Sequence, residues 1–120
     1  MDDTLFRSFT IGESASYRRD LDVLVCHSDS TAFLRTVPDG TVRLVVSSPP
    51  YNIGKPYERK RDLVDYLAWQ SEVLEQCVRA LVDGGSLCWQ VGNYVESGEI
   101  VPLDALFYPL LKENWGLKLR

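Results

Sequence analysis

Two consecutive prolines follow an apolar run, and this feature restricts the fold more than any other. Val42 to Val46 is largely apolar, and Ser47-Ser48-Pro49-Pro50 comes directly after it. Neither proline has an N–H group to donate to a neighbouring strand, so a strand must end here. The next residues, Tyr51-Asn52-Ile53-Gly54-Lys55, are of the types found where a buried parallel strand opens into a binding loop. Since open α/β sheets bind ligands at such strand ends, we predict the functional edge of the sheet at this loop.

The residues before this loop predict two strands and one short helix. Asp20 to Cys26 reads as a first strand, whereas residues 1–20 have apolar positions too loosely spaced to predict an element. Ser28-Asp29-Ser30 is expected to cap a short helix over Thr31–Thr36, because Ser and Asp side chains accept hydrogen bonds from the free N–H groups there. After a turn at Pro38-Asp39-Gly40, the second strand runs from Val42 to Ser47.

A long amphipathic helix is expected after the loop. Asp62 is a suitable N-cap, and apolar residues recur at helical spacing from Leu63 to Leu81. We expect Asp83-Gly84-Gly85 to end this helix, since glycine adopts the left-handed conformation that a helix end needs.

The rest of the chain predicts a third strand, a further helix and the opening of a fourth strand. The third strand is Ser86 to Val91, and the helix runs from Leu103 to about Asn114 with a bend at Pro109. Gly116 to Arg120 resembles the opening of the fourth strand. Strands that alternate with helices predict an α/β fold, a mostly parallel sheet with right-handed crossover helices in one domain over residues 1–120.

Composition excludes several classes of protein. A net charge of −4 does not favour a protein that grips nucleic acid over its whole surface, although Lys55, Arg59, Lys60 and Arg61 form a local basic run. Such a run is often only a solvated face. The three cysteines and His27 lack the spacing of a metal site, so none is predicted. With no leader-like start and no apolar run of membrane length, we predict a cytoplasmic protein.

The proline loop suits the binding of an amino group. Prolines contribute carbonyl oxygens but no N–H donors, so the turn is rich in fixed hydrogen-bond acceptors. The Ser48 hydroxyl and the Pro49 carbonyl could each accept one hydrogen of the exocyclic amine of cytosine or adenine. These acceptors would stabilise the charge that develops when the nitrogen attacks a methyl donor, and Tyr51 offers a face on which the base could stack.

Ser48-Pro49-Pro50-Tyr51-Asn52 resembles the catalytic signature of the DNA amino-methyltransferases, which methylate N4 of cytosine or N6 of adenine. The resemblance extends over roughly residues 21–120 and includes the Gly84-Gly85 turn with the strand after it. It implies a partial Rossmann-like methyltransferase fold, S-adenosylmethionine as methyl donor, double-stranded DNA as substrate and a restriction-modification role. Such enzymes take the target base out of the duplex.

The resemblance also implies roles for particular residues. Ser48, Pro49, Pro50 and Tyr51 would form the catalytic site, with Ser48 and Pro49 on the target amine and Tyr51 on the base. The position of the loop beside the proposed base pocket, and not the resemblance, predicts contacts to DNA from Asn52, Lys55, Arg59 and Lys60. Asp29 matches an acidic position of the family that is implicated in binding the methyl donor, although Ser28 replaces the usual glycine. A helix-capping role for Asp29 is the alternative.

One hallmark of the family is absent from these 120 residues: the aromatic-x-Gly-x-Gly turn that cradles S-adenosylmethionine. We therefore expect the chain to be the N-terminal catalytic portion of a longer enzyme, inactive alone, and to need a C-terminal half or partner subunit. Exposed sheet edges would then favour self-association. The alternatives are a non-catalytic fragment or split-enzyme subunit, and an amino-methyltransferase of RNA or of protein glutamine. Ser before Pro-Pro slightly favours cytosine over adenine and leaves the choice open.

Overall fold

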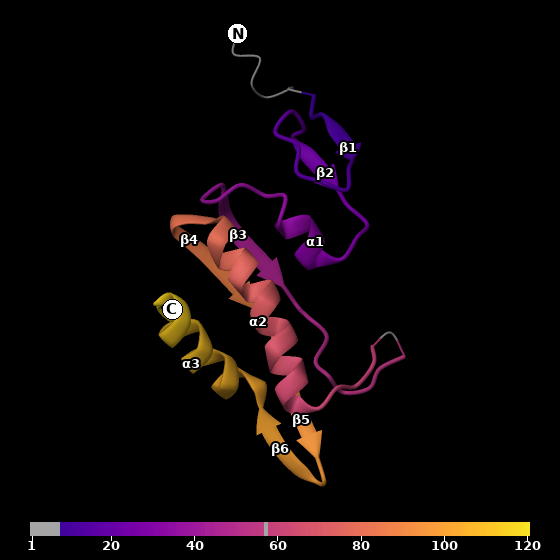
Figure 1. Ribbon diagram of the computed structural model, residues 1–120, viewed down its shortest axis with the longest axis vertical. Coiled ribbons are helices and arrows are strands. Elements are labelled where there is room, and N and C mark those ends of the chain that lie inside the picture. Colours follow the sequence, from indigo (N-terminus) through magenta and orange to yellow (C-terminus); the bar gives the residue numbers. More distant parts are fainter. Residues whose placement is uncertain (1–7, 57) are drawn as a thin grey trace.

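A parallel pair of strands, β3 (Val42–Ser47) and β4 (Leu81–Trp89), lies at the centre of the computed structural model, which describes residues 8–56 and 58–120 (Figure 1). Helix α2 (Leu63–Ala80) connects the two strands and covers one face of the pair. The predicted strand at Val42–Ser47 is confirmed, and so is the N-cap, because the Asp62 side chain accepts a hydrogen bond from the Asp65 N–H at 3.0 Å.

The predicted end of helix α2 is wrong by several residues. The helix ends at Ala80, and Asp83-Gly84-Gly85 lies inside strand β4. Leu81 already has extended backbone angles, because it pairs with Val42 on β3. The register between the strands then shifts before Leu44 pairs with Ser86, so the two glycines occupy an irregularity of the strand and not a helix end.

The N-terminal part of the chain forms a separate small sheet. Strand β2 (Val23–Val25) is shorter than the predicted strand from Asp20 to Cys26, and it pairs in parallel with β1 (Ile11–Glu13). The sequence did not predict β1, because three residues with one half-buried side chain give no usable pattern. Helix α1 (Ser30–Leu34) follows as predicted, and its N-cap is Asp29.

A β-hairpin that the sequence analysis missed follows β4. Strands β5 (Asn93–Glu96) and β6 (Glu99–Pro102) are antiparallel, and Ser97 and Gly98 connect them. Both connecting residues have positive φ, 51° and 80°, which is the requirement of a two-residue type I′ turn. The Ser97-Gly98 pair was therefore the available sequence signal.

Helix α3 (Leu103–Trp115) matches the predicted helix, and Pro109 lies inside it. The predicted fourth strand at Gly116–Arg120 is wrong, because these residues form no strand. Gly116 instead takes a left-handed conformation with φ of 64° and donates its N–H to the Lys112 carbonyl at 2.9 Å. This glycine closes α3, and among the described residues no strand pairs with the segment after it.

An aromatic core joins α2, α3 and the β5–β6 hairpin. The rings of Tyr66 and Phe107 meet edge to face with their centroids 6.3 Å apart, and Trp69 meets Tyr66 in the same way at 6.2 Å. The fully or almost fully buried members of the core are Tyr66, Leu74, Tyr94, Leu103 and Phe107. All three tryptophans pack against this cluster, as expected of residues with such large apolar surfaces.

The described part of the chain is elongated and leaves apolar sheet surface exposed. Its radius of gyration is 17.2 Å, whereas a compact chain of this length would have about 14 Å. Leu44 and Val46 on β3 are 55% and 70% exposed, and within the described ranges β3 pairs only with β4. The α/β class with short parallel pairs is confirmed, and no described helix is long and apolar enough to cross a membrane.

Arg79 ties the α1 region to helix α2. Its guanidinium donates to the carbonyl oxygens of Leu34 at 2.7 Å and Val37 at 2.8 Å, and it forms an ion pair with Asp39. The planar guanidinium holds its donors in a fixed fork that spans these separate acceptors, and the compact ammonium group of lysine does not reproduce this geometry.

We therefore expect Arg79→Lys to lower the free energy of unfolding by about 2 kcal/mol. Urea unfolding followed by circular dichroism measures the change. Arg43→Lys, at an exposed residue of β3, is the matched control and should leave stability unchanged. Equal stability of both variants would show that the Arg79 contacts contribute nothing.

Candidate active site

The proline turn lies at the carboxyl edge of the β3–β4 pair. Ser47 at the end of β3 pairs with Trp89 at the end of β4, and the Gln90 N–H donates to the Ser47 carbonyl at 2.9 Å. Because the strands are parallel, the segments after Ser47 and after Trp89 leave the sheet at the same edge. Ser48–Tyr51 and Gly92 are thus brought together from two different strands.

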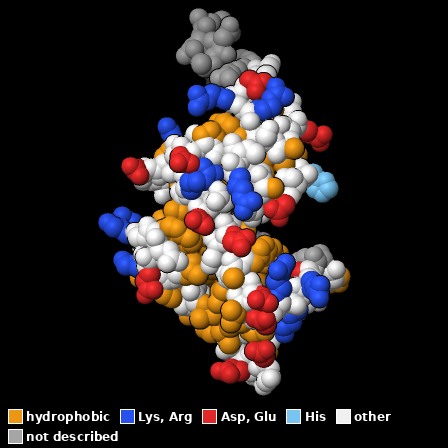
Figure 2. All heavy atoms as spheres, viewed as in Figure 1, with side chains coloured by type: hydrophobic (Ala, Val, Ile, Leu, Met, Phe, Trp, Pro, Cys, Tyr) orange, Lys and Arg blue, Asp and Glu red, His pale blue; other side chains and the backbone are white. Residues whose placement is uncertain are grey.

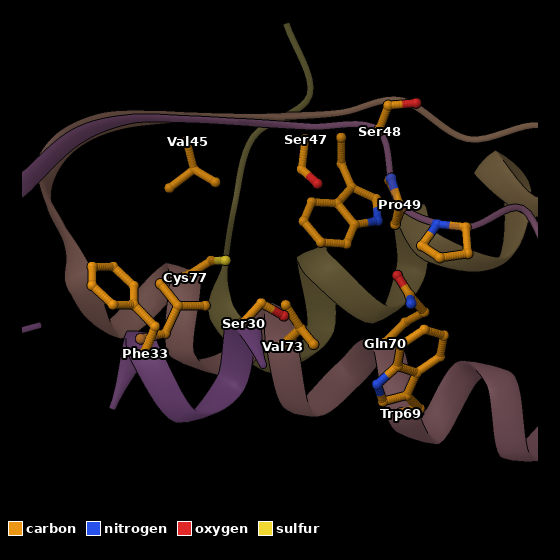
Figure 3. Close-up of a pocket in the computed structure, with 13 residues that line it drawn as sticks. Ser30, Phe33, Val45, Ser47, Ser48, Pro49, Trp69, Gln70, Val73 and Cys77 are labelled. Carbon is orange, nitrogen blue, oxygen red and sulfur yellow. The ribbon is translucent and has the colours of Figure 1, made fainter. Parts of the chain in front are cut away.

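The side chains of Ser48 and Tyr51 contact each other directly. Their hydroxyl oxygens are 2.7 Å apart, at hydrogen-bonding distance. Ser48 is exposed and points away from α2 in Figure 3, whereas Tyr51 is half-buried. A Cβ atom on Gly92 would lie 3.2 Å from Cδ2 of the Tyr51 ring, so the ring packs closely against the Gly92 backbone. Gly92 was not predicted as a site residue, although it directly follows the predicted strand Ser86–Val91, and strand ends are where such sheets bind ligands.

Tyr66 on α2 anchors the proline turn through a hydrogen bond. Its hydroxyl donates to the Pro50 carbonyl at 2.6 Å, and the side chain is only 1% exposed. Burial, with a smaller contribution from the charges of Glu58 and Tyr51, raises the pKa of Tyr66 to about 12. The hydroxyl therefore stays protonated and keeps donating. Sequence analysis missed Tyr66 because a tyrosine does not stand out on a helix defined by its leucines.

Asn52 has a structural role in the loop, and the DNA contact predicted for it stays a prediction. The side chain is 2% exposed, and the backbone has φ of 60°. Its amide group donates to the Arg61 carbonyl at 2.7 Å and accepts from the Arg61 N–H at 2.6 Å. The amide oxygen and the amide nitrogen thus both bind the backbone of Arg61 and join the two ends of the loop.

Glu58 is a second loop residue that the sequence analysis did not single out. Its carboxylate accepts hydrogen bonds from the backbone N–H groups of Asn52, Ile53 and Lys55. A glutamate between basic residues gives no sequence signal for such a role, because the contact depends on how the loop folds back.

The predicted basic residues do not all lie free at the surface. Lys55 and Arg59 are exposed, and Figure 2 shows Lys and Arg side chains gathered over the loop between β3 and α2. Lys60, by contrast, donates to the Val95 carbonyl at 3.1 Å and lies 5.0 Å from the centre of the Tyr94 ring. Of the three, Lys60 is therefore the one that also ties the loop to the β5–β6 hairpin.

Asp29 acts as a helix cap in the structure. Its Oδ1 atom accepts a hydrogen bond from the Ala32 N–H at 3.0 Å, which satisfies a donor at the start of α1. This contact matches the alternative that the sequence left open. The role in binding a methyl donor stays a prediction.

A cavity of about 420 Å³ lies between the β3–β4 pair and helices α1 and α2, directly beneath the turn. In Figure 3, Val45 and Ser47 point into it from the sheet, and Gln70 projects from α2 toward Pro49. Gln70 is 1% exposed, and its Oε1 atom has no hydrogen-bond partner; the Nε1 atom of Trp89 also has none. The cavity is lined by Ser30, Phe33, Leu34, Val45, Ser47, Ser48, Pro49, Pro50, Trp69, Gln70, Val73, Cys77 and Trp89.

The acceptor-rich turn at the carboxyl edge of the parallel pair holds the residues in which the sequence resembles the DNA amino-methyltransferases, and comparison with known proteins supports that resemblance. A family model described as DNA methylase matches residues 42–119, which include the turn, α2, β4 and α3. The chain belongs to this DNA methylase family. The predicted resemblance to the DNA amino-methyltransferases is thereby confirmed.

Three curated relatives are similar to the chain over part of their length. The type II methyltransferase M.BglII of Bacillus subtilis is 47% identical over 94 residues, which cover 78% of this chain and 26% of that protein. The type II methyltransferase M.ScaI of Streptomyces caespitosus is 37% identical over 109 residues, 83% of this chain and 36% of that protein. The DNA adenine methyltransferase YhdJ of Escherichia coli K12 is 37% identical over 68 residues, 52% of this chain and 22% of that protein.

The buried Tyr66 hydroxyl yields a pH-dependent prediction. Its folded-state pKa of about 12 lies above the ordinary value of 10, so folding favours the protonated form. The resulting stabilisation is fully present below pH 10 and is lost as the pH rises toward 12. Tyr66→Phe should remove this pH dependence and lower the free energy of unfolding at neutral pH by about 1–2 kcal/mol, because the Pro50 carbonyl loses its donor.

Urea unfolding of both proteins below pH 10 and between pH 10 and pH 12 tests this expectation. Tyr108→Phe on α3 is the control, since Tyr108 is 45% exposed. If Tyr66→Phe and Tyr108→Phe lose the same stability, the bond to Pro50 does not support the turn.

Proposed function

We propose that the chain is part of an S-adenosylmethionine-dependent, site-specific DNA methyltransferase that modifies an exocyclic amine, N4 of cytosine or N6 of adenine. The observation that carries the proposal is the position of Ser48-Pro49-Pro50-Tyr51 at the carboxyl edge of a parallel strand pair, in a chain that belongs to the DNA methylase family. Its relatives M.BglII and M.ScaI are named type II methyltransferases, which supports a role in restriction-modification. We further propose that it acts in the cytoplasm.

The chain's own residues would bind and orient the target amine. The Ser48 hydroxyl can donate to the Tyr51 oxygen and still accept an amine hydrogen, because a hydroxyl has two lone pairs. The Pro49 carbonyl is the second acceptor, since the Pro50 carbonyl is already bonded to Tyr66. Acceptors fixed in this way favour the positive charge that develops on the nitrogen, without a cost of reorganisation. The proton then leaves the product nitrogen for solvent.

Tyr51 would provide the stacking surface for an extruded base. Its ring is held on one side by the Gly92 backbone and at its hydroxyl by Ser48. A base removed from its duplex loses stacking energy, and an aromatic side chain can replace part of it. Exposed Lys55 and Arg59 on the neighbouring loop would contact DNA phosphates, which orient the duplex without reading its sequence. Lys60 could add a phosphate contact only by giving up its bond to the hairpin.

S-adenosylmethionine, when bound, supplies an electrophilic methyl group on a sulfonium ion. The cavity beneath the turn fits the uncharged part of such a molecule, because two lining residues offer buried polar atoms without a partner, the acceptor Oε1 of Gln70 and the donor Nε1 of Trp89. Its lining residues carry no charged side chain, so the charged amino-acid end of the cofactor would find its partners elsewhere.

The chain spans 22% to 36% of the length of the three relatives described. We propose that residues 1–120 are the N-terminal catalytic portion of the enzyme. Further polypeptide, covalently attached or in a partner subunit, would pack on the exposed apolar face of β3. Without that polypeptide, the same face would favour self-association. A non-catalytic fragment is the alternative function.

Substitutions at the turn test the proposed activity in a methyltransferase that contains this chain. Ser48→Ala removes one acceptor and should lower kcat by about 100-fold. Tyr51→Ala should lower kcat/KM by about 10- to 100-fold, whereas Tyr51→Phe keeps the stacking ring and should lose little. Transfer of a labelled methyl group to duplex DNA measures all three. Full activity of Ser48→Ala and Tyr51→Ala would exclude this turn as the active site.

The 120-residue chain by itself should neither transfer methyl groups nor bind S-adenosylmethionine measurably in calorimetry, because its cavity lacks charged partners for the cofactor. Adding the polypeptide that corresponds to the rest of a relative should restore transfer. Tight one-to-one binding by the chain alone would contradict the proposed division of the enzyme. Continued inactivity after the addition would favour the non-catalytic alternative.

A further inference from the structure

The loop after the catalytic turn folds around a single carboxylate. Glu58 Oε2 accepts a hydrogen bond from the Asn52 N–H at 3.0 Å. Oε1 accepts from the Ile53 N–H at 3.0 Å and from the Lys55 N–H at 3.2 Å. The backbone N–H of Glu58 donates to the Lys55 carbonyl at 2.9 Å. Both carboxylate oxygens and the backbone of Glu58 therefore bind the same four-residue segment.

Residues 52–55 would not adopt this conformation from their own backbone preferences. Asn52 and Gly54 both have left-handed backbone angles, with φ of 60° and 76°. For a residue with a side chain, this conformation costs roughly 1 kcal/mol. It turns successive N–H groups to one side, which creates a concave site for an anion. In this structure the anion is the Glu58 carboxylate.

The electrostatics of the site agree with this geometry. Partial burial by itself raises the pKa of a carboxyl group. The hydrogen bonds from the loop N–H groups outweigh burial and hold the pKa of Glu58 below its ordinary value. The side chain is thus ionised at neutral pH, as its acceptor role requires.

The Glu58 contacts reach the catalytic turn through the backbone. Asn52 follows Tyr51, so the bond to the Asn52 N–H fixes the peptide plane on the C-terminal side of Tyr51. Tyr66 fixes the preceding carbonyl, that of Pro50. Tyr51 is therefore clamped between one contact from the aromatic core and one from the loop.

We propose that Glu58 is a positioning residue: its carboxylate orders residues 52–55, and thereby sets the orientation of Tyr51 and directs Lys55 outward. The importance of this order for catalysis rests on the proposed function, whereas the ordering itself does not. Nothing in the residue pattern around Glu58 predicts this role.

Amide hydrogen exchange in the 120-residue chain tests the ordering directly. Glu58→Ala should accelerate exchange at Asn52, Ile53 and Lys55 by about tenfold or more, since each loses a charged acceptor. Exchange of the Tyr66 N–H, which donates to the Asp62 carbonyl in α2, should not change. Added sodium acetate should restore part of the protection in Glu58→Ala, because its carboxylate can enter the vacated site.

Two further variants keep the test decisive. Glu58→Gln retains one acceptor oxygen, so its loop amides should exchange at rates between those of the unsubstituted chain and Glu58→Ala. This variant replaces Glu58→Ala in the test if Glu58→Ala does not fold. Glu75→Ala, an exposed glutamate on α2, is the matched control and should leave the loop amides unchanged. Unaltered exchange at Asn52 and Ile53 in the Glu58 variants would overturn the proposal. So would acceleration that extends equally to α2 and does not respond to acetate.

Activity in a methyltransferase that contains this chain provides the second readout. Glu58→Ala should lower kcat for methyl transfer more than it raises KM for DNA, because it misplaces Tyr51. Lys55→Ala should mainly raise KM. Suppose that Glu58→Ala accelerates exchange in the loop, but the unsubstituted protein has no methyltransferase activity. This result would refute the proposed function and leave the ordering role of Glu58 intact. Normal kcat of Glu58→Ala in an active enzyme would refute the positioning role alone.

Discussion

The hydrogen bond from the Tyr66 hydroxyl to the Pro50 carbonyl is the contact on which the site depends. Tyr66 is a member of the aromatic core, in edge-to-face contact with Phe107 and Trp69. The same side chain therefore stabilises the packing of α2 against α3 and fixes the turn after β3. A turn anchored in the core can present acceptors at fixed positions, which a surface loop of the same sequence could not do.

The clamped turn explains how a small set of neutral groups could assist methyl transfer. Proline supplies a carbonyl without a competing N–H, Tyr66 occupies the next carbonyl, and the Ser48 and Tyr51 hydroxyls contact each other. Under the proposed function, the Ser48 hydroxyl and the Pro49 carbonyl are the acceptors left for the exocyclic amine. Such a site works by orientation and by stabilising developing charge, so it needs no residue with a strongly shifted pKa at the reacting atoms.

Local sequence signals predicted the elements whose ends are marked by side-chain chemistry. Val42–Ser47 ends at two prolines, and α1 and α2 begin at Asp29 and Asp62, whose carboxylates cap the first turn. The predictions failed where pairing between distant strands decides the outcome. Gly84 lies in β4 because Leu81 pairs with Val42. The failure at Gly116 is different and local, because this glycine ends α3 in a left-handed conformation where a strand was predicted.

The sequence by itself determined the α/β class, the place of the turn and the caps of α1 and α2, because prolines and caps act over a few residues. Only the tertiary structure decided that Asn52 is buried, that Lys60 binds the hairpin and that Glu58 and Tyr66 clamp Tyr51. These contacts join residues on different elements or on opposite sides of a folded loop. Their geometry follows from the packing of α2 and from left-handed backbone angles at Asn52, which no short sequence pattern encodes.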